Sequence, residues 1–215
     1  LGTGWDNEIR SVAMIVVGGS GICTGALINN SCSDGTPYFL TANHCLGGST
    51  GSWAFRFNWQ SPPGTESCAT TAGSTDPGPP YDQTANGATT LVNSGASDYA
   101  LLEIDNMSLS DAQNWNCYFA GWDASDLTTV TEATGIHHPS GDVKKICREN
   151  DAPYHSNAGG AAVWYIDEWE EGVTEPGSSG SPLFDQNHRI IGQLYGGAAA
   201  CAGTSNNGQY DFYGR

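Results

Sequence analysis

Two segments of the sequence can supply the acid–base partners of a hydrolytic reaction. His44 lies in Thr41-Ala42-Asn43-His44-Cys45, directly after the apolar run Tyr38-Phe39-Leu40, where the neighbouring cysteine can tether a general base. Asp98 opens the apolar run Tyr99–Ile104, where an aspartate can be buried against an imidazole. Each residue alone also fits an ordinary structural role, as a surface histidine or an aspartate at the start of a strand.

A third segment can supply a nucleophile. Ser179 lies in Gly177-Ser178-Ser179-Gly180, and a glycine-flanked turn of this kind can expose a hydroxyl. The surrounding backbone N–H groups can then converge on a developing oxyanion. A flexible Gly/Ser loop is the alternative, but the order His44, Asp98, Ser179 favours nucleophilic hydrolysis of an acyl group.

The elements that must position these residues are short strands. Apolar side chains recur with period two, as in Trp53–Trp59, which is typical of half-buried strands. Turn residues separate the runs, and no convincing helix of three turns is present. Many short strands with frequent turns predict an all-β sandwich or barrels. The other predicted strands are Ser11–Val17, Ile22–Ile28, Pro37–Thr41, Tyr99–Ile104, Cys117–Trp122, Ala161–Ile166, Ser181–Phe184 and Arg189–Tyr195.

Composition and charge indicate the compartment of the protein and the kind of partner it can bind. The 215 residues include 29 glycines and seven cysteines, and the cysteines favour an oxidising compartment. With 23 acidic against 7 basic residues the formal charge is −16, which disfavours nucleic acid and acidic membranes as partners and favours cations and basic polypeptides. Solubility or salt tolerance explains the acidity equally well. No run approaches the length of a membrane-spanning helix.

Organisation along the chain follows from its polar segments. Residues Ala69–Thr90 are rich in Pro, Gly, Ser, Thr and Asp, which predicts a long surface loop within the first half. We expect the seam between the two halves near Asn106–Asn116.

The three motifs together resemble the signatures of the chymotrypsin-like serine proteases: Thr-Ala-x-His-Cys, Asp-x-x-Leu-Leu and Gly-x-Ser-Gly-x-Pro. Further segments, running in order from about Arg10 to Arg215, resemble the bacterial lysyl endopeptidases. These segments are Tyr38–Cys45, Ala120-Gly121-Trp122-Asp123, Gly135-Ile136-His137-His138-Pro139, Val173–Pro182 and Gly192-Gln193-Leu194.

The resemblance implies two antiparallel six-stranded β-barrels with the active site in the cleft between them. Residues 1–108 would form the barrel that carries His44 and Asp98. Residues 109–215 would form the barrel that carries Ser179 and the specificity pocket. Because the family's chains continue at both ends, we expect the natural chain to be longer and the second barrel to be incomplete at its C-terminus.

The resemblance also assigns roles at the reaction centre. Ser179 would be the nucleophile, His44 the general base and Asp98 the residue that orients His44, with the oxyanion hole formed by the N–H groups of Gly177 and Ser179. Ser178 stands where trypsin-like enzymes usually carry an aspartate that pairs with a new N-terminal ammonium. We therefore expect a zymogen that matures by loss of a propeptide without that salt bridge.

Specificity for a basic side chain needs a buried anion. Val173 occupies the place of the trypsin aspartate, so the resemblance moves this role to Asp211 in Asp-Phe-Tyr-Gly-Arg, with Thr174, Tyr195 and Gly196 as further substrate-binding residues. An aspartate in a turn is the alternative for Asp211.

Three departures from the family keep arginine or mixed basic specificity open. Tyr195 stands where the family has a histidine, and a pocket hydroxyl is missing near Ala199. The tryptophan that stacks on the catalytic histidine has no clear match, Tyr154 and His155 being nearest.

The remaining cysteines and histidines are less informative. The resemblance implies a Cys23–Cys45 disulfide, and Cys32–Cys68 is a weaker assignment. Cys117, Cys147 and Cys201 stay unassigned, and the odd count leaves one thiol over. No spacing of ligands fits zinc, so His137 and His138 are interpreted as structural, and no metal or cofactor is expected.

The sequence therefore predicts a secreted, monomeric serine endopeptidase that cleaves polypeptides after lysine. The alternatives are an arginine-preferring or broadly basic-specific protease, and a catalytically silent secreted binding module.

Overall fold

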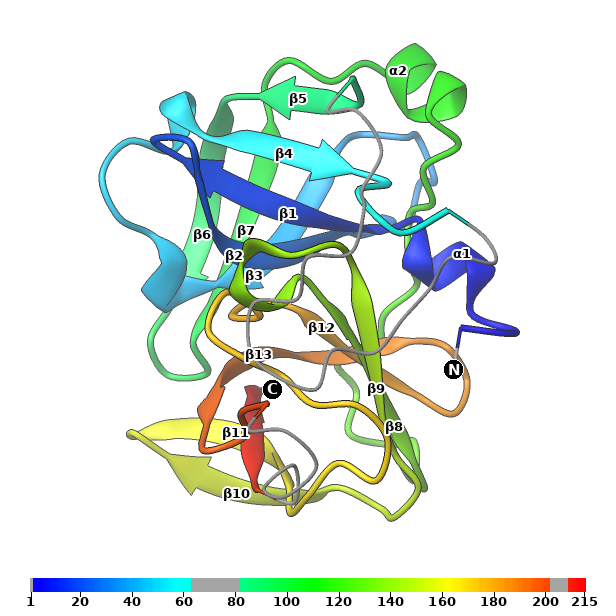
Figure 1. Ribbon diagram of the computed structural model, residues 1–215, viewed down its shortest axis with the longest axis vertical. Helices are drawn as coiled ribbons and strands as arrows, with labels where there is room; N and C mark the ends of the chain where they lie inside the picture. Colours follow the sequence, from blue (N-terminus) through cyan, green and yellow to red (C-terminus); the bar gives the residue numbers. More distant parts are fainter. Residues whose placement is uncertain (1, 63–81, 202–208) are drawn as a thin grey trace.

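The computed structural model describes residues 2–62, 82–201 and 209–215, which form two seven-stranded antiparallel sheets, one above the other in Figure 1. The first sheet has the strand order β5-β4-β1-β2-β3-β7-β6. Its strands are β1 (Val12–Val17), β2 (Ser20–Leu27), β3 (Tyr38–Ala42), β4 (Ala54–Phe57), β5 (Thr84–Asn86), β6 (Ala88–Ser94) and β7 (Tyr99–Ile104).

The second sheet has the order β10-β11-β14-β13-β12-β8-β9. Strand β14, from the end of the chain, lies inside this sheet, between β11 and β13. The strands are β8 (Ala133–His137), β9 (Lys145–Glu149), β10 (Tyr154–Ala158), β11 (Ala161–Ile166), β12 (Pro182–Asp185), β13 (Ile190–Gly197) and β14 (Asp211–Gly214).

Helical structure in the described residues is confined to short elements. These are α1 (Asp6–Ile9), α2 (Leu109–Asn114) and three 3-10 turns, η1 (Asn43–Cys45), η2 (Thr50–Ser52) and η3 (Pro139–Gly141). Ser108 caps α2 by accepting a hydrogen bond from the Asp111 N–H. This helix lies in the segment where we expected the seam. In the part of the chain that the structure describes, no helix has the length and apolar composition needed to cross a membrane.

Each sheet has its own apolar core, and a third core lies between them. In β4 and β7 the side chains alternate between buried and partly exposed, so Phe55, Phe57 and Leu102 enter the first core. Strand β1 is buried nearly throughout because Ile15 faces that core whereas Val12 belongs to the core shared with the second sheet. The shared core fixes how the two sheets sit against each other.

The expectation of an all-β fold built from two sheets is confirmed, with seven strands in each sheet instead of six. The predicted strand Cys117–Trp122 is wrong. This segment makes only isolated bridges, from Ala120 to Ile28 of the first half and from Trp122 to Ile190 of the second, because it crosses between the sheets.

The predicted loop Ala69–Thr90 is also partly wrong, because its end forms β5 and the start of β6. The polar composition of these strands hid them, since few of their side chains enter the core. The rest of that loop, residues 69–81, lies outside the described residues. Strands β8, β9, β10 and β14 were not predicted either.

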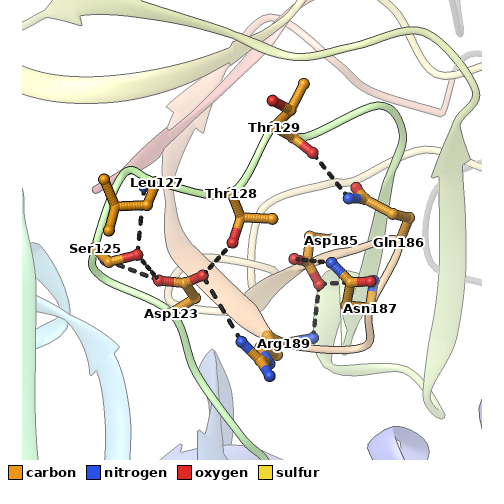
Figure 2. A network of polar contacts seen from close by, with 9 residues as sticks. All are labelled: Asp123, Ser125, Leu127, Thr128, Thr129, Asp185, Gln186, Asn187 and Arg189. Carbon is orange, nitrogen blue, oxygen red and sulfur yellow. Dashed lines mark hydrogen bonds and ion pairs between the residues drawn. The ribbon is translucent and has the colours of Figure 1, made fainter.

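After segment 117–122 has crossed between the sheets, side-chain hydrogen bonds hold the chain against the β12–β13 hairpin (Figure 2). The Gln186 amide donates to the Thr129 carbonyl at 2.9 Å and accepts from the Thr131 N–H at 3.1 Å. Asp123 closes the intervening turn by accepting from the hydroxyls of Ser125 and Thr128. Hydrogen bonds, first that from Ser125, lower the pKa of Asp123 to about 2. The turn is therefore held by an ionised carboxylate at all ordinary pH values.

Candidate active site

His44 and Asp98 meet where two neighbouring strands of the first sheet end and begin. Ala42, at the end of β3, pairs with Tyr99, at the start of β7. His44 Nδ1 lies 2.7 Å from Asp98 Oδ2, and the His44 N–H donates to Asp98 Oδ1 at 2.9 Å. The carboxylate is buried, whereas the imidazole is 36% exposed. The arrangement fixes the orientation of the ring and leaves its Nε2 edge available to a reacting group.

Two further contacts hold the His44 turn. The structure joins Cys23 to Cys45 by a disulfide, the pairing that the resemblance implied, and so ties η1 to β2. The Asn43 N–H donates to the Asp98 carbonyl at 2.7 Å. Cys68, the partner suggested for Cys32, lies outside the described residues.

The second sheet holds the residues just before Asp98. The side-chain amide of Gln193 donates to the Ser97 carbonyl at 2.8 Å, and the Ala162 N–H donates to the Ala96 carbonyl at 2.9 Å. Asp98 itself has φ of 53°, a left-handed conformation that costs a non-glycine residue energy and needs support of this kind. Gln193 belongs to the Gly192-Gln193-Leu194 motif, but the sequence did not predict that it supports Asp98. Only the tertiary structure brings β13 close to residue 97.

Ser179 reaches the first sheet through a close backbone approach. Its carbonyl accepts from the Thr24 N–H at 2.7 Å and lies 3.8 Å from Cys45 Sγ. A Cβ atom on Gly180 would lie 2.2 Å from Thr41 Oγ1, so only glycine permits this contact. Ser179 from the second half of the chain is thereby placed beside the turn that carries His44.

A general base must reach the proton that it removes, but Ser179 Oγ and the His44 ring are not hydrogen-bonded to each other. In the described part of the chain the Ser179 hydroxyl has no hydrogen-bond partner. Catalytic hydrogen bonds are often long without substrate and tighten in the reacting complex. The structure thus forms the His44–Asp98 pair and brings the Ser179 backbone close to it.

All five backbone carbonyl groups of residues 175–179 accept hydrogen bonds. Within the loop, the Ser178 N–H donates to the Glu175 carbonyl and the Ser181 N–H donates to the Ser178 carbonyl. From outside it, the Ser140 N–H donates to Pro176, Thr24 Oγ1 to Gly177 and the Thr24 N–H to Ser179. In a trans peptide the C=O and the next N–H point in opposite directions. The hydrogen bonds to the Pro176 and Ser178 carbonyls therefore fix the directions of the Gly177 and Ser179 N–H groups. Neither N–H has a hydrogen-bond partner among the described residues.

Asp211 lies buried in the second sheet, 1% exposed, at the start of β14. Its Oδ2 accepts from Thr174 Oγ1 at 2.6 Å and from Trp169 Nε1 at 2.7 Å. A Cβ atom on the facing Gly197 would lie 2.0 Å from its Oδ1, so glycine makes room for the carboxylate. The structure thus brings together Asp211 and Thr174 and adds Trp169, for which the sequence offered no signal.

No basic side chain in the described chain neutralises Asp211. Burial, the largest influence, raises its pKa to about 7 against the opposing effect of its hydrogen bonds. A buried carboxyl group with a strongly perturbed pKa and no cation is typical of a functional site. The site is chemically suited to receive a positive charge.

Tyr195 and Gly196 lie between His44 and the Asp211 strand. The Tyr195 ring is 5.8 Å from the His44 ring, centre to centre, and 5.2 Å from that of Phe212 in an edge-to-face contact. Tyr154 and His155, the suggested counterparts of the family tryptophan, instead contact Tyr165 and Trp164. Among the described residues, Tyr195 therefore provides the aromatic contact to His44.

Two groups of potential metal ligands occur among the described residues. The carboxylates of Glu149, Asp151 and Glu170 come within 4.8 Å of one another, and burial raises the pKa of Glu149 to about 7. The other group, Cys23, His44 and Cys45, contains the disulfide and cannot offer thiolates. His137 and His138 are fully buried and hydrogen-bonded to Ser178 and to the Asp142 carbonyl.

Comparison with solved structures places this fold. A Glu endopeptidase superposes with a TM-score of 0.58 at 21% identity over 96% of this chain and 85% of its own. A thermostable serine protease from an extremophilic microorganism gives 0.58 at 14% identity over 97% and 92%. The fold is that of the chymotrypsin-like serine proteases.

The family follows from the sequence comparisons. The family described as "Lysyl endopeptidase, C-terminal domain" matches residues 2–214. A lysyl endopeptidase of Pseudomonas aeruginosa is 30% identical over 230 residues, which cover 98% of this chain and 46% of that protein. The chain belongs to the lysyl endopeptidase family and spans about half the length of this relative.

Proposed function

We propose that the chain is a secreted serine endopeptidase that hydrolyses peptide bonds on the carboxyl side of lysine. Ser179 Oγ attacks the scissile carbonyl while His44 takes its proton and later gives it to the leaving amine. Asp98 keeps the His44 proton on Nδ1 and stabilises the imidazolium, and the Gly177 and Ser179 N–H groups bind the oxyanion. Water then hydrolyses the acyl-enzyme. Residues 1–108 and 109–215 are the two barrels that contribute these groups.

The observation that carries this proposal is the buried Asp211 carboxylate without a cation. A substrate lysine would place its ammonium there at the end of a long apolar stem, with Thr174, Tyr195 and Gly196 beside it. The net charge of −16 supports basic polypeptides as substrates of a monomeric enzyme.

The hydrogen bonds already made by Asp211 favour lysine over arginine. Its Oδ2 accepts from both Trp169 and Thr174. A carboxylate oxygen offers about two lone-pair positions, so Oδ1 alone remains to accept. An ammonium can bind there as a point charge, whereas the guanidinium fork needs two parallel acceptors.

Two measurements test the proposal. A fluorophosphonate reagent should label the protein stoichiometrically at Ser179, and failure to label together with failure to hydrolyse would leave a silent binding module. Digestion of a protein of known sequence should produce new C-termini at lysine. Equal cleavage after arginine would replace lysine specificity with broad basic specificity.

A further inference from the structure

Ser178, between the two proposed oxyanion donors, is bonded to a histidine from a distant strand. Both Ser178 and His137, the last residue of β8, are fully buried at 0% exposure. Ser178 Oγ lies 2.8 Å from His137 Nδ1. The Gly-Ile-His-His-Pro motif that contains His137 has no part in the chemistry proposed above.

The Ser178 side chain also closes the turn in which it lies. Its Oγ accepts from the Glu175 N–H at 3.1 Å, while the Ser178 N–H donates to the Glu175 carbonyl at 2.9 Å. The hydroxyl can still exchange one hydrogen bond with His137, whose pKa burial lowers to about 3. The imidazole is therefore neutral at neutral pH, and this buried bond is held between uncharged groups.

The orientation of the reacting N–H groups depends on this turn. The Ser178 carbonyl accepts from the Ser181 N–H, which sets the Ser179 N–H on the opposite side of the same peptide. The direction of the Gly177 N–H is fixed in the same way by the hydrogen bond from the Ser140 N–H to the Pro176 carbonyl. Ser140 follows His137 by three residues, so the end of β8 and the turn after it together contact Pro176 and Ser178.

We propose that His137 and Ser178 are positioning residues that hold the Gly177 and Ser179 N–H groups on the oxyanion in the absence of any charged partner. This inference rests on the proposed protease function. The pair touches neither substrate nor reacting atoms, and it acts by keeping the donors oriented before the reaction begins. Such donors stabilise charge only in the transition state. Loss of the pair should thus lower kcat and leave KM unchanged.

The test compares Ser178→Ala with Ser11→Ala. Ser11 is equally buried and also makes a hydrogen bond, to the Glu8 carbonyl, but lies in the N-terminal segment. Ser178→Ala should lower kcat on a lysine ester by about 10- to 100-fold with KM changed less than about twofold. A peptide aldehyde, which forms an oxyanion on Ser179, should lose affinity by the same factor. Ser11→Ala should lower Tm comparably and keep its kcat.

A second pair of variants isolates the hydrogen bond itself. His137→Asn keeps an amide near the position of Nδ1, whereas His137→Ala removes every polar atom there. His137→Asn should retain more kcat than His137→Ala, and Ser178→Ala combined with His137→Ala should be no slower than either single variant.

Several results would overturn the inference. Unchanged kcat in Ser178→Ala with an active parent protein rejects the positioning role and leaves the protease function standing. A reduced count of fluorophosphonate-titrated sites with a normal rate per site means partial unfolding, and also rejects it. A parent protein that neither labels nor hydrolyses refutes the proposed function, and this inference with it.

Discussion

Asp98 makes two hydrogen bonds with His44, one between Oδ2 and ring Nδ1 at 2.7 Å and one from the His44 backbone N–H to Oδ1 at 2.9 Å. Both bonds lie at one end of the β3–β7 ladder, where Ala42 pairs with Tyr99. The first sheet therefore brings the two residues together, and the second sheet supports Asp98 through the bond from Gln193 to Ser97. The nucleophile, in contrast, arrives from the second sheet, and its placement depends on the contact between the sheets.

Asp98→Asn should lower kcat on the order of 10⁴-fold. The asparagine oxygen can keep the bond from the His44 backbone, but its NH₂ then faces Nδ1 and forces the ring proton onto Nε2. His44 can then no longer take a proton from Ser179. Kinetics on a lysine ester measure the effect. Asp105→Asn, at an exposed position just after β7, serves as control, and comparable losses in both variants would contradict the role of Asp98.

Asp211→Asn should lower kcat/KM for lysine substrates about 10²- to 10³-fold, because the ammonium loses its buried counter-charge. Substrates with a neutral side chain at that position should be cleaved no more slowly. The ratio of the two rates is the measurement, with the exposed Asp167→Asn as control. Unchanged preference for lysine would exclude Asp211 from the specificity site.

The same residue predicts a pH dependence of stability. The pKa of Asp211 is about 7 in the folded chain against an ordinary value of 3.8. Between these values the folded state binds more protons than the unfolded state, so this carboxyl lowers the free energy of unfolding as pH rises from about 4 to about 7. Asp211→Asn lacks this dependence. Relative to the parent, it should gain up to about 1.4 kcal/mol per pH unit in that window.

Urea unfolding curves at pH 5 and pH 8 measure this difference directly. Asp105→Asn, at an exposed position, should differ from the parent protein by the same amount at both pH values. An offset for Asp211→Asn that stays constant from pH 5 to pH 8 would show that the carboxyl is not destabilised by burial.

Gly180→Ala should abolish activity by separating Ser179 from the His44 turn. Its Cβ would lie 2.2 Å from Thr41 Oγ1 and 2.5 Å from the Thr24 carbonyl, so the backbones must move apart. Gly19→Ala is the matched control, because Gly19 also has positive φ but nothing within 4 Å of its Cβ. The control should lose only about 1–2 kcal/mol of stability, the cost of a left-handed conformation for alanine, and keep its rate. An active Gly180→Ala protein would show that this close approach is dispensable.

Removal of the disulfide should cost about 3 kcal/mol, since Cys23 and Cys45 close a loop of 22 residues. The double variant Cys23→Ala/Cys45→Ala should show this loss in the free energy of unfolding. Cys147→Ala removes a buried thiol without breaking this bridge and gives the cost of lost volume alone. A double variant no less stable than that control would mean that the bridge contributes nothing.

The sequence by itself determined the class of fold and the residues that can react. Period-two apolar runs specify half-buried strands, and the motifs around His44, Asp98 and Ser179 are local, so they are legible without coordinates. Polar edge strands such as β5 and β6 escaped because few of their side chains enter a core. Segment 117–122 was wrongly predicted to be a strand, because an apolar run has the same pattern whether it pairs in a sheet or crosses between two sheets.

Only the tertiary structure decided how distant residues act together. The Gln193 bond to Ser97, the Trp169 bond to Asp211 and the His137 bond to Ser178 each join residues far apart in sequence. The first contact joins the two sheets, and the other two bring separate segments of the second half together, so no local pattern encodes them. Burial without a cation is likewise a property of the folded core, and it turns the Asp211 carboxylate into a candidate receptor for lysine.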